Sequence, residues 1–293
     1  MKDYAIYLDS SADIDPSFIK EHDIGIVAMS YTFGDQNRVC DGTEDEAFLK
    51  RFYDGQRAGD LTQTSQVTPQ QYMDAFTPAL EKGKAVLCIS LSGGLTNSHD
   101  SIRLAKIELS EQFPDRTVYS VDSLGATVGI GLLAELAVKN RAHGLSAEEN
   151  ARDLNNMRHK VCHLFMVEDL MYLKRGGRVS AAAAVIGTAL GVKPILVIDE
   201  KGTLTVTDKK RGEKSALEEL ERRFLASRDP EIHRVAIIHA DVQQRAEKLA
   251  QKARDADPEA RVTISPLGPI IGAHTGPGLT GIVYFGDRRA MMK

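Results

Sequence analysis

The feature of this sequence that most constrains its fold is the alternation of short apolar runs with longer segments of helical periodicity. Apolar runs at 85–89 and 117–121 each precede such a segment, and 98–111 has apolar residues at helical spacing. Strands that alternate with helices favour a parallel sheet covered by helices. The first half of the chain therefore predicts an α/β domain with a parallel sheet, which includes strands at 4–8 and 25–31.

Capping side chains mark several predicted helix starts in this half. A polar residue followed by proline, or followed three residues later by Glu or Gln, satisfies the free amides of a first helical turn. Such pairs are Asp15 with Pro16, Thr43 with Glu46, Thr68 with Gln71, and Ser146 with Glu149. We also expect Ser98 to cap the helix over 98–111, and we expect 124–141 to form a buried helix because it is apolar almost all round.

The second half predicts a mixed sheet. Apolar runs at 194–198 and 203–207 flank a turn-rich stretch that reads as a hairpin, strands follow at 162–167, 234–240 and 261–265, and 281–285 closes the sheet. A helix of small residues is expected at 181–190. At 293 residues, the chain is long enough for two domains. We predict two α/β domains with mixed, largely parallel sheets at 1–158 and 159–293, with an approximate boundary.

Composition and charge argue against several classes of function. The net charge of −4 and the absence of tryptophan argue against nucleic-acid binding. The first ten residues carry no leader-like apolar core, and no run is long enough for stable membrane insertion, so we expect a cytoplasmic protein. Three widely spaced cysteines fit buried, reduced thiols. The scattered histidines lack metal-ligand spacing, and no cofactor motif is present.

Polar clusters at 62–68, 90–101, 122–123 and 272–278 lie at or near predicted strand ends, where ligands gather in α/β sheets. Hydroxyls and helix-start amides suit an oxyanion such as a carboxylate or phosphate, although each hydroxyl alone also fits helix capping. His274 lies between glycines and could donate to a carboxylate or be a structural histidine. The basic loop at 174–178 could bind phosphate, face a partner, or form a solvated turn.

Several motifs, taken in order, resemble the DegV family of fatty-acid-binding proteins, which includes the binding subunit of bacterial fatty acid kinase. The resemblance covers essentially the whole chain. The motifs are Asp9-Ser10-Ser11-Ala12-Asp13, Asp41-Gly42, Thr64-Ser65-Gln66, Asp122-Ser123, the run from Tyr172 to Ser180, Lys193-Pro194-Ile195-Leu196, and the run from Gly272 to Gly278. Their order and spacing together are specific, although Thr96, Asn97 and Val67 replace the family's serine, glycine and proline.

The resemblance implies that a long-chain fatty acid such as palmitate, stearate or oleate lies in a tunnel between the two domains. It implies a carboxylate site formed by Thr64, Ser65, Thr96, Asn97, His274 and Thr275. It also implies an ATP-dependent kinase as partner, with possible contacts at Arg211 and Arg175, and no cofactor besides the bound lipid. The segments 181–190 and 124–136 could line the acyl tunnel or simply form core.

An enzyme that acts on a small acyl or phosphorylated metabolite is the alternative. His274 would then serve as acid and base, and Thr96 or Ser98 as nucleophile. The sequence places no acidic partner next to His274, which argues against this alternative. We therefore expect a lipid-binding protein that is not an enzyme by itself and that presents the carboxyl end of its ligand to a kinase.

Overall fold

The computed structural model describes residues 4–180 and 191–293. The predicted parallel sheet is present in the first half, with strand order β2-β1-β6-β7 and every neighbouring pair parallel. Its strands are β1 (Tyr4–Asp9), β2 (Ile24–Val27), β6 (Ala85–Ser90) and β7 (Val118–Asp122). Two groups of helices contact it: α3 (Pro69–Glu81) and α4 (Ser98–Gln112) pack together, as do α5 (Val128–Ala142) and α6 (Ala147–Met157), while α1 (Pro16–Glu21) lies beside β2.

A mixed sheet forms the second half, as predicted, in the order β10-β9-β8-β13-β11-β12. Its strands are β8 (Val161–Met166), β9 (Val192–Ile198), β10 (Leu204–Arg211), β11 (Arg234–His239), β12 (Arg261–Pro266) and β13 (Thr280–Phe285). β11 and β12 pair in parallel, whereas the other neighbours run antiparallel, including the predicted β9–β10 hairpin. Helices α9 (Glu213–Ser227) and α10 (Gln243–Ala256) cover one face, and α12 (Arg288–Met291) packs on α9.

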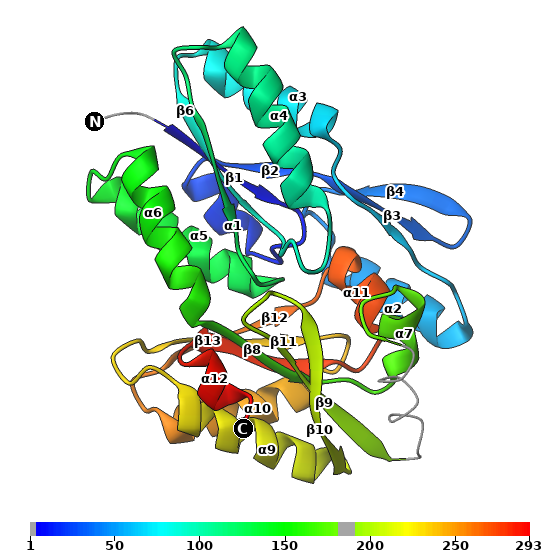
Figure 1. Cartoon of the computed structure of the whole chain (residues 1–293). Coiled ribbons are helices and arrows are strands. Elements are labelled where there is room, and N and C mark those ends of the chain that lie inside the picture. Colours follow the sequence, from blue (N-terminus) through cyan, green and yellow to red (C-terminus); the bar gives the residue numbers. More distant parts are fainter. Residues whose placement is uncertain (1–3, 181–190) are drawn as a thin grey trace.

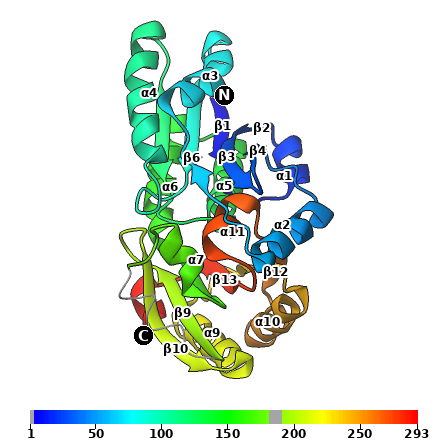
Figure 2. The same cartoon turned by 90° about the vertical axis from the view of Figure 1, so that its right-hand side faces the viewer.

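A small antiparallel sheet, β4-β3-β5, was not predicted. It consists of β3 (Met29–Phe33), β4 (Gln36–Cys40) and β5 (Thr64–Ser65), and α2 (Glu46–Ala58) lies between the last two in the chain. Helix α11 (Pro269–Thr275) contacts β3, α2 and α7 (Leu170–Arg175). Figures 1 and 2 show α11 and α7 beside the place where the two large sheets meet.

One apolar core joins the two large sheets. Helix α5 contacts β1 and β6 of the parallel sheet and also β8 and β13 of the mixed sheet. The buried residues of both sheets belong to the same cluster, which includes Ile6, Leu87, Leu133, Phe165 and Val283. A second cluster lies under α9 and α10 on the other face of the mixed sheet. The two halves therefore share a buried boundary, and α5 is its central element.

Several predicted elements differ from the structure. The strand expected at 25–31 is two strands, β2 and β3, which pair in different sheets, because apolar periodicity does not specify a partner. Asp45 caps α2 in place of Thr43, whose hydroxyl instead donates to Asp41 at 2.6 Å. The helix expected from 124 begins at Val128, and the strand expected to close the sheet, β13, lies inside it between β8 and β11.

Candidate functional site

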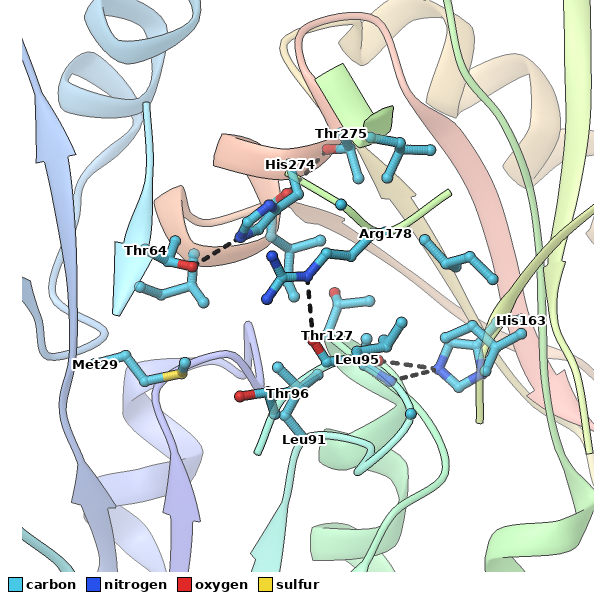
Figure 3. A pocket seen from close by; sticks show the side chains of 18 of the residues that line it. Met29, Thr64, Leu91, Leu95, Thr96, Thr127, His163, Arg178, His274 and Thr275 are labelled. Carbon is cyan, nitrogen blue, oxygen red and sulfur yellow. Dashed lines mark hydrogen bonds between the residues drawn. The ribbon is translucent and has the colours of Figure 1, made fainter. Parts of the chain in front are cut away.

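A cavity of about 410 Å³ lies where the small sheet, α11, the start of α5 and the mixed sheet converge. Figure 3 shows its side chains pointing toward one another from these separate elements. Its volume is within the range of ligand pockets. Much of its lining is apolar and comes from Met29, Leu91, Leu95, Ala126, Phe165, Leu173, Ile198, Leu204, Ile238, Ile270, Ile271 and Leu279. The cavity therefore suits a ligand that is mostly hydrocarbon.

The polar residues of this cavity include most of the predicted carboxylate site. Thr64 of β5 and His274 of α11 are 210 residues apart, yet Oγ1 of Thr64 lies 2.7 Å from Nε2 of His274. Thr96 and Asn97 line the same cavity from the loop after β6. Thr96 Oγ1 lies 3.0 Å from Oγ of Ser98. Side chains from both halves of the chain thus meet around one end of an apolar space. We call these four residues, Thr64, Thr96, Asn97 and His274, the head-group cluster.

Two predicted site residues have less favourable positions. Ser65 is exposed and is not among the residues that line the cavity. Thr275 lines the cavity, but its hydroxyl donates to the carbonyl of Ile271 at 3.2 Å within its own helix. Ser98 was expected as a helix cap; the cap position is Asn97, which makes no side-chain capping bond, and the Ser98 hydroxyl accepts a hydrogen bond from the Val67 amide at 3.3 Å instead.

His274 is held as a neutral imidazole. Burial and the nearby positive charge of Arg178 lower the pKa of His274 to about 4. Its Nδ1 is buried and has no hydrogen-bond partner in the described part of the chain. An unpaired acceptor is more readily tolerated than an unpaired N–H, so we assign the proton to Nε2, which donates to Thr64. The Thr64 hydroxyl then keeps its own proton available for an anion in the cavity.

Arg178 is a cavity residue that sequence reasoning did not single out. It belongs to the basic loop at 174–178, which by sequence fits phosphate binding, a partner contact or a solvated turn. Lys174 and Arg175 of that run lie in the last turn of α7. Nε of Arg178 donates to the Leu95 carbonyl at 3.1 Å, and Nη1 donates to the Gly176 carbonyl. No carboxylate lies within ion-pairing distance of it among residues 4–180 and 191–293. Its charge is therefore available to an anionic ligand.

A second hollow lies on the outer side of the head-group cluster. It shares Thr64, His274 and Arg178 with the inner cavity, and Tyr172 and Arg175 also line it. The guanidinium of Arg175 lies 4.5 Å from the ring centroid of Tyr172, which places this exposed charge at the rim. Thr64, His274 and Arg178 thus lie between the apolar cavity and this outer hollow.

The loop that carries Thr96 and Asn97 is anchored to the mixed sheet. The Ser92 hydroxyl donates to the carbonyl of Gly202, in the β9–β10 turn, at 2.8 Å. A Cβ at Gly94 would lie 2.6 Å from the same carbonyl, so only glycine permits this approach of two backbones. The head-group cluster is therefore held together by contacts between the two halves.

The far side of the cavity carries a second histidine that sequence reasoning missed. His163 of β8 lies opposite Thr64 in Figure 3 and is 1% exposed. Its Nε2 is 3.0 Å from the carbonyl oxygen of Ala126. Burial, with a smaller effect of the Arg288 charge, lowers the pKa of His163 to about 3, so its ring is neutral. Among residues 4–180 and 191–293, the lining of this end of the cavity carries no ionised group.

The remaining predicted positions fall in three places. Ala126 and Thr127 of the segment 124–136 line the cavity, whereas the segment 181–190 lies outside the described residues. Leu204 lines the cavity at one end of β10, and Arg211 is exposed at the other end, roughly 20 Å away along the strand. Arg211 is therefore not part of the head-group cluster.

No group of three or more His, Cys, Asp or Glu side chains in residues 4–180 and 191–293 is placed to hold a metal ion. In the same ranges, no helix combines the length and the apolar character needed to cross a bilayer.

Comparison with known proteins gives one family. Residues 3–287 match the sequence model of the DegV family, which is described as uncharacterised proteins. A DegV domain-containing protein of Clostridium perfringens is 33% identical over 293 residues, which cover 99% of each chain.

Two solved structures are similar over nearly the whole chain. The fatty-acid-binding DegV family protein from Thermus thermophilus is 27% identical, with a TM-score of 0.85 over 98% of this chain and 100% of that chain. The fatty acid kinase B3 protein of Streptococcus pneumoniae, loaded with linoleic acid, is 23% identical, with a TM-score of 0.85 over 97% of this chain and 99% of that chain. At that identity the second likeness concerns the fold alone.

Proposed function

The chain belongs to the DegV family, and from this premise we propose that it binds a long-chain fatty acid in the cavity between its two large sheets. The observation that carries the proposal is the position of the head-group cluster at one end of an otherwise largely apolar cavity. The fatty-acid binding of the Thermus thermophilus relative supports it. Palmitate, stearate and oleate are the class of ligand that we propose.

The hydrocarbon tail supplies most of the binding free energy. A C16 acid has about fourteen methylenes, and at about 0.8 kcal/mol for each buried methylene the transfer free energy is roughly 11 kcal/mol. Lost translational, rotational and chain freedom offset a large part of that amount. Tight binding of the tail therefore requires only an apolar cavity that is long enough.

The head-group cluster has the complementary task of holding the carboxylate. A buried anion needs hydrogen bonds or a counter-charge to offset its lost hydration. The Thr64 hydroxyl, oriented by His274, and the Thr96 hydroxyl supply hydrogen bonds. The guanidinium of Arg178 supplies the positive charge. We propose that these four residues hold the carboxylate, with Asn97 and Thr275 at the edge and Ser65 outside direct contact.

We further propose that the protein presents this carboxylate to an ATP-dependent kinase that forms an acyl phosphate. The outer hollow gives a route to the head group, since it shares Thr64, His274 and Arg178 with the inner cavity. Arg175 at the rim and Arg211 on β10 would then contact the kinase at separate points. Replacing either arginine by glutamate should lower acyl-phosphate formation by the kinase while leaving palmitate affinity unchanged.

Among residues 4–180 and 191–293, the contacts of His274 favour binding over turnover by this chain alone. His274 contacts Thr64, whereas the enzyme alternative needs it beside Thr96 or Ser98 as the nucleophile. No carboxylate orients its Nδ1 among the described residues. We therefore keep the binding role as the proposal.

The decisive experiment is extraction of lipid from protein purified from cells, followed by mass spectrometry. An acyl chain in an amount comparable to the protein, and uptake of added palmitate by delipidated protein, are the expected results. Protein that yields no acyl chain and takes up no palmitate would refute the proposed function. Turnover of acyl esters or ATP by the purified chain would show that binding is not its whole activity.

A further inference from the structure

Asp13 ends the motif Asp9-Ser10-Ser11-Ala12-Asp13, and the proposed function leaves it without a role. It lies between β1 and α1, with its backbone in the left-handed region at a φ of 44°. Its Oδ1 accepts a hydrogen bond from the amide of Gly268 at 2.9 Å. Gly268 is the N-cap residue of α11, which carries His274 near its other end. Asp13 is therefore tied to an element of the ligand cavity.

The side chain of Asp13 lies beside Thr127 of the cavity wall, and Asp13 also lines a separate hollow together with Glu44 and Gly268. Oδ2 is buried, and so is Oγ1 of Thr127; neither atom has a partner at hydrogen-bonding geometry among the described residues. The Thr127 hydroxyl is nevertheless the side-chain group that most favours the ionised form of Asp13. Thr127 itself lines the cavity, at a φ of 48°, which a β-branched residue rarely adopts. Asp13 is partly buried, with Oδ2 inaccessible to solvent, and it neighbours a residue that lines the cavity.

Burial and the nearby negative charges disfavour the ionised form of Asp13. Burial is the largest cause, and with the negative charges of Glu44 and Asp9 it raises the pKa of Asp13 to about 7. The other titratable groups that face it are Cys40 of β4 and Tyr53 of α2, and burial raises the pKa of both. No cation pairs with Asp13 in the described ranges. At neutral pH its carboxyl group is therefore poised between the two protonation states.

We propose that Asp13 is a proton-binding site linked to the ligand cavity through Thr127, so that a fatty acid entering the cavity draws a proton onto Asp13. This inference rests on the proposed function, because it needs an acyl ligand that fills the cavity. An acyl chain against Thr127 expels water from that side of the wall and brings no counter-charge, so the ionised carboxyl group loses further solvation.

Linkage gives the sign and the size of the effect. Because the complex binds the proton more tightly than the free protein, affinity is full below pH 7 and falls as the pH rises through the two pKa values. If the ligand raises the pKa of Asp13 by about one unit, affinity falls about fivefold between pH 6 and pH 8. His274 and His163 do not produce this change, because the pKa values of about 4 and about 3 lie below the window.

The test is calorimetric titration of palmitate into delipidated protein at pH 6, 7 and 8, in two buffers that differ in ionisation enthalpy. The two buffers together count the protons taken up. The wild-type protein should take up a fraction of one proton near neutral pH and bind about fivefold more weakly at pH 8 than at pH 6. Asp13→Asn still accepts from Gly268 and can donate to Thr127, so it should bind equally well at all three pH values without this uptake.

Asp15→Asn is the matched control, because Asp15 is an exposed cap residue two positions away and asparagine caps helices equally well. It should keep the wild-type pH dependence. Wild-type protein whose affinity is constant from pH 6 to pH 8, with no proton uptake, overturns the inference whether or not the variant folds, and leaves the proposed function intact. Uptake that persists in Asp13→Asn also overturns it. Failure to bind palmitate at any pH refutes the proposed function and this inference with it.

Discussion

Replacement of Thr64 by valine removes one hydroxyl from the head-group cluster with little change in side-chain volume. Oγ1 of Thr64 lies 2.7 Å from Nε2 of His274, and Nδ1 of that ring has no partner among the described residues. The variant therefore leaves both nitrogens of a partly buried imidazole without a hydrogen bond to the described residues. A buried polar group without a partner costs about 1–3 kcal/mol, so we expect the free energy of unfolding of the unliganded protein to fall by that amount.

The same substitution should weaken ligand binding, because the Thr64 hydroxyl is proposed to donate to the carboxylate. A hydrogen bond to a charged group contributes about 1.5–3 kcal/mol, so the Kd for palmitate should rise roughly 10- to 150-fold. Urea denaturation measures the first effect, and calorimetric titration of delipidated protein measures the second.

Ser65→Ala is the matched control for this experiment. Ser65 is the next residue of β5, but it is exposed and does not line the cavity, so its loss should change stability and affinity by less than about 0.5 kcal/mol. A Thr64→Val protein with wild-type affinity would refute the place given to Thr64 in the carboxylate site. An unchanged free energy of unfolding would show that His274 does not depend on Thr64 for its hydrogen bond.

Three further outcomes follow from the packing and charges of this site. Gly129→Ala should lower the free energy of unfolding, measured by urea denaturation, by about 1–3 kcal/mol, because its Cβ would clash with the buried His163 ring. Gly131→Ala is the control: its Cβ would have its nearest neighbour at 3.6 Å, so it should stabilise α5 by about 0.5–1 kcal/mol. Equal effects of the two substitutions would contradict this packing. Arg178→Gln should weaken palmitate binding about tenfold but leave binding of uncharged hexadecanol unchanged, and an equal loss for both ligands would indicate a structural role. Since burial raises the pKa of Asp13 to about 7, the wild-type protein loses stability as the pH rises toward that value. The melting temperature of Asp13→Asn should therefore increase relative to that of the wild-type protein between pH 5 and pH 8. A difference in melting temperature that stays constant over this range would argue against a raised pKa.

Much of the local structure was predictable from the chain because its causes act over a few residues. Asp15, Thr68 and Ser146 accept hydrogen bonds from amides in the first turns of their helices, as their spacing predicts. The β9–β10 hairpin and the parallel pairing of the first sheet also follow from turn chemistry and from strand–helix alternation. The resemblance to the DegV family predicted that Thr64, Thr96 and His274 belong to one site. Their spacing in the sequence alone does not predict this.

The tertiary structure determined those features that depend on contacts between distant parts of the chain. It divided one apolar run into β2 and β3, and it placed β13 inside the mixed sheet. It also placed Arg178, one charge of a basic loop, in the wall of the cavity, and it brought Asp13 next to Thr127. Strand–helix alternation and capping residues specify single helices and strands, because they depend on neighbouring residues. Strand partners, buried charges and shifted pKa values instead arise from contacts between residues up to 255 positions apart, such as Asp13 and Gly268.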